Sequence, residues 1–281
     1  MQTLVRSLGA VLFVFMFSQA VSGEELPFQG IEKTKTFPEL PDTLFKKIRG
    51  IDEPPAVSVS FPLDYDATKS YPVVLFMGGS QGHSGLSAQP VRRIFGDRDF
   101  ICISLPLFLE HLDPLAENGS NKWSRMYIAP SEAGFIWAQY KVLLAAAFEM
   151  IPNADPRRCF IGGFSNGANT TAALLSHPET RDGLLKYFRN FFLIEGGDEI
   201  DPVIAPADAT YYMAWGDDRQ DWRQEFINQF QKKAAELSAL SQKVVTHEMP
   251  GTGHAFPPSE QKLLREYILK LAGEPVATRR P

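Results

Sequence analysis

The sequence predicts an α/β protein with a mostly parallel central sheet and helices on both faces of that sheet. Several short segments, such as residues 71–77 and 100–105, are apolar at successive positions, which is the pattern of strands buried on both faces. They alternate along the chain with longer helical patterns, such as residues 132–151 and 222–239. This alternation is typical of parallel strands joined by crossover helices.

The expected elements follow one another in a regular order. The expected strands cover residues 56–63, 71–77, 100–105, 158–162, 191–195, 209–215 and 243–249. The expected helices cover residues 132–151, 166–176, 222–239 and 259–271. Right-handed crossovers bring the carboxyl ends of parallel strands to one edge of the sheet, where open α/β sheets bind their ligands. Residues that directly follow a strand are therefore the candidates for function.

Composition and length favour one folded domain. The 281 residues are 44% hydrophobic and 22% charged, which is ordinary for a globular protein. We expect this domain over residues 56–273, with an arm over its surface at 24–55 and a tail at 274–281. The net charge is −5, and no basic block is present that could neutralise phosphates, so we expect no nucleic acid as a partner.

Residues 1–23 have the layout of a secretory signal peptide. Arg6 precedes the apolar run 8–17, and small residues follow at 18, 20, 22 and 23. The run is short against the about 20 residues that a membrane-spanning helix needs. We therefore expect export, either secreted or periplasmic, with no membrane association once the segment is removed.

The two cysteines, Cys102 and Cys159, both lie in apolar runs that we expect to be buried strands. Export would permit a disulfide, but free buried thiols fit this setting better. Two cysteines are too few for a zinc framework, and no histidine lies at ligand spacing beside them. We expect neither a metal nor a cofactor.

The motif GxSxG, with Ser165 at its centre, occurs at residues 163–167, between an expected strand and an expected helix. In this setting a sharp turn lifts the serine hydroxyl above the sheet, and glycines flank it because side chains there would clash. The helix amino terminus also favours a developing negative charge. Ser165 is therefore our candidate nucleophile.

A serine nucleophile needs a base, and the base needs an acid that orients it. Of the 5 histidines, His254 lies in a glycine-rich loop after the last strand, whereas His247 lies within that strand, so we expect His254 to be the base. The acid should follow the strand 209–215. Asp221 and Asp218 are both candidates there, Asp221 with an alternative role as a helix cap, and Asp217 is a third.

An oxyanion hole needs two amides directed at one point. One comes from the residue after the nucleophile and the other from the loop after an earlier strand. These criteria select Asn166 and the glycine-rich segment 78–82, in which we expect Gly79 to be the donor.

Together these segments resemble secreted esterases of the α/β-hydrolase fold, of the polyhydroxyalkanoate-depolymerase and feruloyl-esterase types, and the related phospholipase/carboxylesterases. The likeness rests on residues 61–66, 70–76, 253–258 and the serine motif, and it covers about residues 55–271. It implies an α/β-hydrolase fold and hydrolysis of a carboxylic ester, small or borne on a polymer, through an acyl-enzyme. Ser165 and His254 match the family's nucleophile and base.

Three further details refine this resemblance. Asp221 followed by Trp222 looks like the acid–aromatic pair that opens the next helix in such esterases, which favours Asp221 as the acid. Met77 is a departure, because a histidine usually precedes the glycine of the oxyanion loop. Too few residues lie between 195 and 209 for the helical lid of many lipases, so we expect no large lid domain, and residues 118–128 are candidates for a pocket wall.

Two other functions fit the same fold. One is a serine peptidase, although we expect no additional domain that could bind a peptide terminus. The other is a non-catalytic exported binding protein.

Overall fold

The computed structural model describes residues 30–108, 133–219, 221–240 and 243–273. The expected signal peptide, the candidate wall segment 118–128 and the tail 274–281 lie outside the described residues, and all three stay predictions. None of the described helices combines the length and the apolar character needed to cross a membrane.

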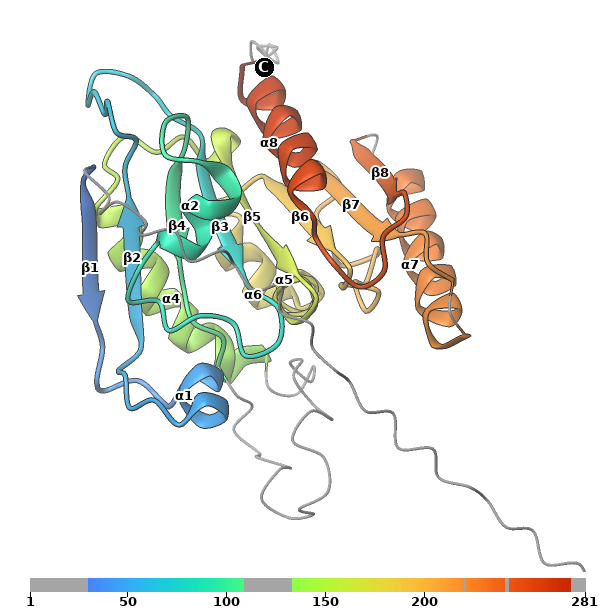
Figure 1. Ribbon diagram of the computed structural model, residues 1–281, viewed down its shortest axis with the longest axis horizontal. Helices are drawn as coiled ribbons and strands as arrows, with labels where there is room; N and C mark the ends of the chain where they lie inside the picture. Colours follow the sequence, from blue (N-terminus) through green and yellow to red (C-terminus); the bar gives the residue numbers. More distant parts are fainter. Residues whose placement is uncertain (1–29, 109–132, 220, 241–242, 274–281) are drawn as a thin grey trace, which may run out of the picture.

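An eight-stranded sheet forms the centre of the molecule, with the strand order β1-β2-β4-β3-β5-β6-β7-β8 (Figure 1). The strands are β1 (Glu32–Thr36), β2 (Ala56–Ser60), β3 (Val73–Met77), β4 (Ile101–Ser104), β5 (Cys159–Phe164), β6 (Asn190–Ile194), β7 (Thr210–Gly216) and β8 (Val244–Met249). All pairs from β4 to β8 are parallel, whereas β2 runs antiparallel to both β1 and β4. The predicted mostly parallel sheet is confirmed.

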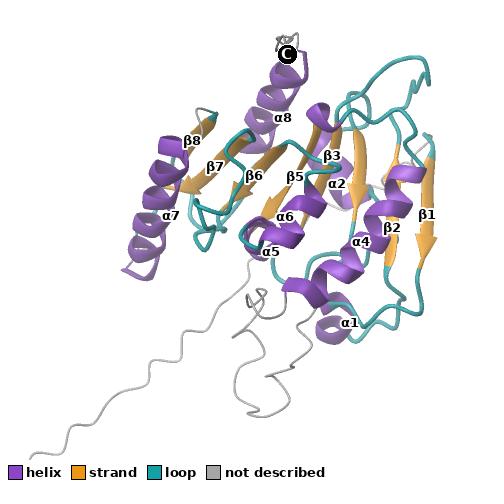
Figure 2. Cartoon of the chain, turned by 180° about the vertical axis from the view of Figure 1, so that it is seen from behind, coloured by secondary structure: helices purple, strands orange, loops and turns teal. Residues whose placement is uncertain are grey.

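Helices cover both faces of the sheet, as predicted. On one face lie α2 (Gln89–Phe95) and α8 (Pro258–Gly273). The opposite face, which Figure 2 turns toward the viewer, carries α4 (Ala133–Glu149), α5 (Asn166–Leu175), α6 (Pro178–Leu184) and α7 (Asp221–Leu240). The short helices α2 and α6 were not expected from the sequence, because each spans only 7 residues and shows little periodicity.

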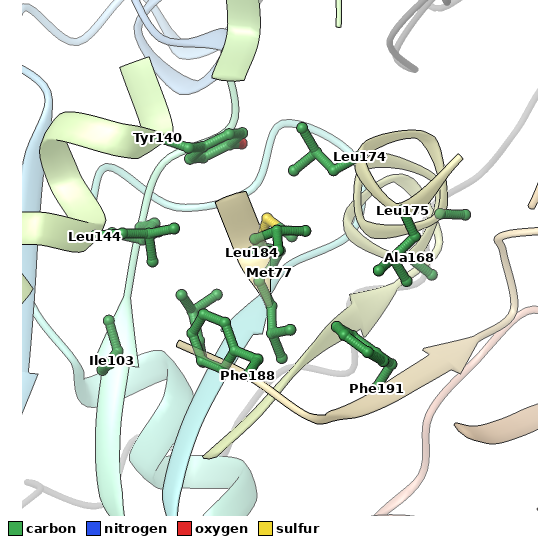
Figure 3. Packing of buried hydrophobic residues seen from close by; sticks show 14 of the residues in the cluster. Met77, Ile103, Tyr140, Leu144, Ala168, Leu174, Leu175, Leu184, Phe188 and Phe191 are labelled. Carbon is green, nitrogen blue, oxygen red and sulfur yellow. The ribbon is translucent and has the colours of Figure 1, made fainter. Parts of the chain in front are cut away.

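The core consists of two apolar layers, one on each side of the sheet. Successive residues of β3 alternate between them, since Leu75 and Met77 belong to the layer of α4 to α7 and Phe76 belongs to the layer of α2 and α8. Figure 3 shows Met77 among apolar side chains of α4, α5 and α6, including Tyr140 and Leu184. Met77, the departure noted in the sequence, therefore contributes to the packing of this layer.

The segment 24–55 was expected to be a surface arm, and this expectation was wrong in part. Its residues 32–36 form β1, which pairs with β2 over its full length from Glu32 opposite Ser60 to Thr36 opposite Ala56. A short helix, α1 (Leu44–Arg49), follows and is capped by the Thr43 hydroxyl, which accepts from the Lys46 amide. β1 is a polar, mostly exposed edge strand, so it lacks the apolar periodicity by which strands are recognised.

Cys102 and Cys159 are buried free thiols, as predicted. They lie in the two different core layers on opposite faces of the sheet. Burial raises the pKa of both thiols, that of Cys159 to about 12. Both therefore act as small apolar side chains of the core.

Candidate active site

Ser165 lies at the turn between β5 and α5 and has an unusual backbone conformation. Its φ of 53° and ψ of −116° fall in a region that non-glycine residues seldom adopt. The Ser165 amide donates to the Ile194 carbonyl at 2.8 Å, and the Ser165 carbonyl accepts from the Asn169 amide at 2.9 Å. These bonds to β6 and to α5 hold the strained turn in place.

The two glycines of the motif are required by backbone contacts. A Cβ atom added at Gly163 would lie 2.4 Å from the Met77 carbonyl oxygen, and one added at Gly167 would lie 2.1 Å from the same oxygen. Real Cβ atoms do not approach an oxygen this closely, so only glycine lets β5 and α5 pack against the end of β3. This confirms the clash that the motif predicted.

The loop after β3 lies beside the serine. A Cβ atom added at Gly79 would be 3.2 Å from the Ser165 Cβ. The Asn166 side-chain amide donates to the Ser80 carbonyl at 2.8 Å, which ties this loop to the start of α5. The two expected oxyanion donors, Gly79 and Asn166, are thus brought together next to the serine.

His254 contacts Ser165 directly. Its Nε2 lies 2.9 Å from the Ser165 Oγ, although the two residues are 89 positions apart in the sequence. His254 belongs to the loop that joins β8 to α8 (Figure 1), and 37% of its side chain is exposed. This loop lies directly on the end of β7, where a Cβ atom added at Gly216 would be 2.1 Å from the Thr252 carbonyl oxygen.

The carboxylate that contacts His254 belongs to Glu195, which the sequence analysis did not select. The Glu195 Oε2 lies 2.9 Å from the Nδ1 of His254. Glu195 follows β6, whereas the acid was expected after β7. The order of serine, acid and histidine along the chain is kept, but the acid comes one strand earlier.

Of the three expected acids, Asp217 and Asp218 have described side chains, and the expectation that one of these two makes this contact is corrected. Asp217 Oδ1 accepts from the Thr252 amide at 3.2 Å, and the Asp218 amide donates to the Thr252 carbonyl at 3.1 Å. Both residues support the loop that carries His254. Asp221 is the first residue of α7, and its side chain lies outside the described part of the chain.

The Glu195 carboxylate is buried in a set of donors. Its side chain is 0% exposed, and it accepts from His254, from the Arg223 guanidinium and from the Gly216 amide. Burial alone would raise the pKa of Glu195, but the hydrogen bonds from His254, Arg223 and Gly216 outweigh it and hold this pKa below its usual range. Glu195 is therefore ionised at neutral pH.

Consecutive strand ends connect the loops of the site. The Ser165 amide donates to the Ile194 carbonyl of β6, the Glu195 amide to the Ala214 carbonyl of β7, and the Asp217 amide to the Met249 carbonyl of β8. Three non-glycine residues in the described chain have positive φ, namely Ser80, Ser165 and Glu195, and all three follow strands at this edge. Backbone strain is thus concentrated at the site, as is common in active sites.

The histidines that were not chosen as the base have other surroundings. His247 Nε2 lies 2.6 Å from the buried carboxylate of Glu260, in agreement with a structural role. The imidazole of His83 packs on the oxyanion loop, where its Cε1 would be 2.8 Å from a Cβ atom added at Gly78. Burial lowers the pKa of His83 to about 4.

His83 should make the protein less stable as the pH falls. Between its ordinary pKa of about 6.5 in the unfolded chain and about 4 in the folded chain, only the unfolded chain binds the proton. The free energy of unfolding should therefore fall by up to about 3 kcal/mol from this group over that interval. We expect His83→Gln to abolish this component, measured by urea denaturation at several pH values. Parallel pH dependences of the two proteins would contradict the prediction.

The strand order, the strained serine turn and the contacts of Ser165, His254 and Glu195 define a protein of the α/β-hydrolase fold. Comparison with known protein families finds no match, and comparison with curated protein sequences finds none either. Within the described residues, no group of three or more His, Cys, Asp or Glu side chains could hold a metal ion.

Solved structures do resemble this chain. SOBER1 from Arabidopsis thaliana matches with a TM-score of 0.51 at 18% identity, over 72% of this chain and 99% of that one. Esterase 2 from the planctomycete Thermogutta terrifontis, phosphoramylated by tabun, matches with a TM-score of 0.55 at 13% identity, over 87% of this chain and 96% of that one. Its butyrate-bound form matches with a TM-score of 0.53 at 11% identity, over 86% and 94% of the two chains. These likenesses support the fold.

Proposed function

We propose that this protein is a serine hydrolase that cleaves carboxylic esters, with Ser165 as nucleophile, His254 as general base and Glu195 as the acid. The observation that carries the proposal is one continuous set of contacts. Ser165 Oγ lies 2.9 Å from His254 Nε2, and His254 Nδ1 lies 2.9 Å from Glu195 Oε2. These are hydrogen-bond distances between a nucleophile, its base and the group that orients the base.

The proposed reaction has two halves. Ser165 Oγ attacks the ester carbonyl while His254 Nε2 takes the hydroxyl proton, and the Asn166 and Gly79 amides donate to the resulting oxyanion. The intermediate collapses, the carbon–oxygen bond to the alcohol breaks, and His254 returns its proton to the leaving alcohol. Water then attacks the acyl-enzyme with His254 again as base, which releases the carboxylic acid and regenerates the Ser165 hydroxyl.

The substrate class follows from the surroundings of the serine and from the structural relatives. The described segment 195–209 between β6 and β7 contains turns and no helix, so no helical lid is inserted there. His254 is exposed beside the serine. Together with the likeness to one esterase, Thermogutta terrifontis esterase 2, which one of its two cited structures shows bound to butyrate, this supports esters of short acyl groups, free or borne on a polymer.

Covalent labelling tests the proposal directly. A fluorophosphonate reacts only with an activated serine, so we expect one adduct per chain, located at Ser165 by mass spectrometry. The same preparation should hydrolyse p-nitrophenyl acetate and butyrate, and prior labelling should abolish that hydrolysis. A correctly folded protein that is neither labelled nor active would instead be the non-catalytic binding protein considered above.

A panel of substrates separates the two enzyme classes. Short esters are expected to be cleaved, and peptide amides with the same acyl group are not. Faster cleavage of the amides would favour the peptidase.

A further inference from the structure

Arg223 is a buried cation whose position the reaction outlined above does not explain. It lies in the first turn of α7, and its side chain is 1% exposed. Its guanidinium binds the Glu195 carboxylate through two parallel contacts, Nη1 to Oε2 at 2.7 Å and Nη2 to Oε1 at 3.0 Å. This paired geometry fixes the plane of a carboxylate as well as its charge.

The guanidinium is itself held by the loop after β7. Arg223 Nε donates to the Asp218 carbonyl at 2.9 Å, and Nη2 also donates to the Gly216 carbonyl at 3.3 Å. The Gly216 amide donates to Oε1 of Glu195. The end of β7 thus supplies the frame around a carboxylate that comes from the end of β6.

A glutamate in this position needs such a frame. Its side chain has one more rotatable bond than that of aspartate, and a buried carboxylate without partners binds a proton. Either a rotated or a protonated Glu195 would leave His254 Nδ1 without a charged acceptor. Oε2 of Glu195 receives both the Arg223 Nη1 contact and the His254 Nδ1 contact, so one oxygen connects the two residues.

We propose that Arg223 is a positioning residue, which fixes the Glu195 carboxylate, ionised and in one orientation, as the acceptor for His254. Arg223 has no direct role in the chemistry and acts only through Glu195. The inference rests on the proposed ester hydrolysis.

A double-mutant cycle tests this route of action. We expect Arg223→Met to lower kcat for p-nitrophenyl butyrate by about 100-fold, with a change in KM of less than about threefold, because substrate binding does not involve Arg223. In a Glu195→Gln background the same substitution should change kcat by less than about twofold, because the group it acts through is gone. The rate of fluorophosphonate labelling gives a second readout for the slow variants.

Stability measurements separate positioning from loss of the fold. Arg223→Met alone leaves a buried carboxylate without its guanidinium partner and should lower the Tm, whereas adding Glu195→Gln removes both charges and should restore most of it. Arg223→Lys keeps the charge but loses the paired contacts, so its kcat should lie between those of wild type and Arg223→Met. Arg219→Met is the matched control, since Arg219 lies on the same loop in an exposed pair with Glu248, and it should keep wild-type kcat.

Two results would overturn the inference. One is a folded Arg223→Met protein with kcat within about threefold of wild type, and the other is an equal loss of kcat in the Glu195→Gln background. If Ser165 is labelled and esters are cleaved, either result removes only the role of Arg223. If wild type is neither labelled nor active, the proposed function fails and this inference fails with it.

Discussion

Replacing Ser165 by alanine is expected to lower kcat for short p-nitrophenyl esters by about 10⁶-fold, the largest effect of any single substitution in this protein. The hydroxyl oxygen is the proposed nucleophile and lies 2.9 Å from Nε2 of His254, the proposed base. The missing oxygen should not lower stability, because alanine fits the same turn with one atom fewer. Steady-state kinetics and a thermal unfolding curve on the same preparation would measure both quantities.

Ser70→Ala is the control for this substitution. Ser70 is exposed in the turn before β3, at the amino-terminal end of that strand, and we expect wild-type rates from the variant. A Ser165→Ala protein that still hydrolysed esters at more than a trace rate would mean that another residue is the nucleophile.

Replacing Glu195 by glutamine is expected to lower kcat by about 10⁴-fold. Glutamine keeps the size and shape of the side chain but removes the negative charge that, in the proposed mechanism, stabilises the imidazolium form of His254. The side-chain amide of glutamine can also direct an N–H group at Nδ1 of His254. This contact selects the tautomer with the proton on Nε2, which cannot take the proton of Ser165. KM should change little, since the Glu195 side chain is fully buried and does not reach the substrate.

The aspartates after β7 provide matched controls for that prediction. Asp217→Asn and Asp218→Asn should each keep kcat within about tenfold of wild type, because both residues support the Thr252 backbone and asparagine can still accept the bond made by Asp217. Asp221→Asn completes the series and is expected to stay active. A large loss of kcat in one of these three variants, together with an active Glu195→Gln protein, would mean that an aspartate after β7 is the acid.

The sequence was sufficient for those parts of the fold and site that depend on local patterns. Strands β3 to β7 were predicted because buried parallel strands are apolar at successive positions, as in Phe191, Phe192 and Leu193 of β6. The sharp turn at Ser165, the candidate nucleophile, was predicted because the backbone contacts of Gly163 and Gly167 leave a local signature. His254 was predicted because it lies in a glycine-rich loop after the last strand.

The acid depends on long-range packing that such patterns do not contain. Three aspartates after β7 met every local criterion, and only the folded chain shows that Glu195 reaches Nδ1 of His254 instead. One signal was present in the sequence. Glu195 is a charged residue at the end of the otherwise apolar strand 191–195, and two glycines follow it. A carboxylate at the end of a buried strand needs a partner, so this position indicates a paired acid. That partner, Arg223, lies 28 residues further along the chain, where the sequence gives no indication of its burial.

The hydrogen bonds that connect the ends of β5, β6, β7 and β8 have a mechanical consequence. The turns at Ser165 and Glu195 and the loop after β7 are each bonded to the adjacent strand, so moving one of them would break a hydrogen bond to that strand. The reacting atoms therefore share the stiffness of the sheet. Adaptation to different esters would then depend on the surrounding loops, while the spacing between the reacting groups stays constant.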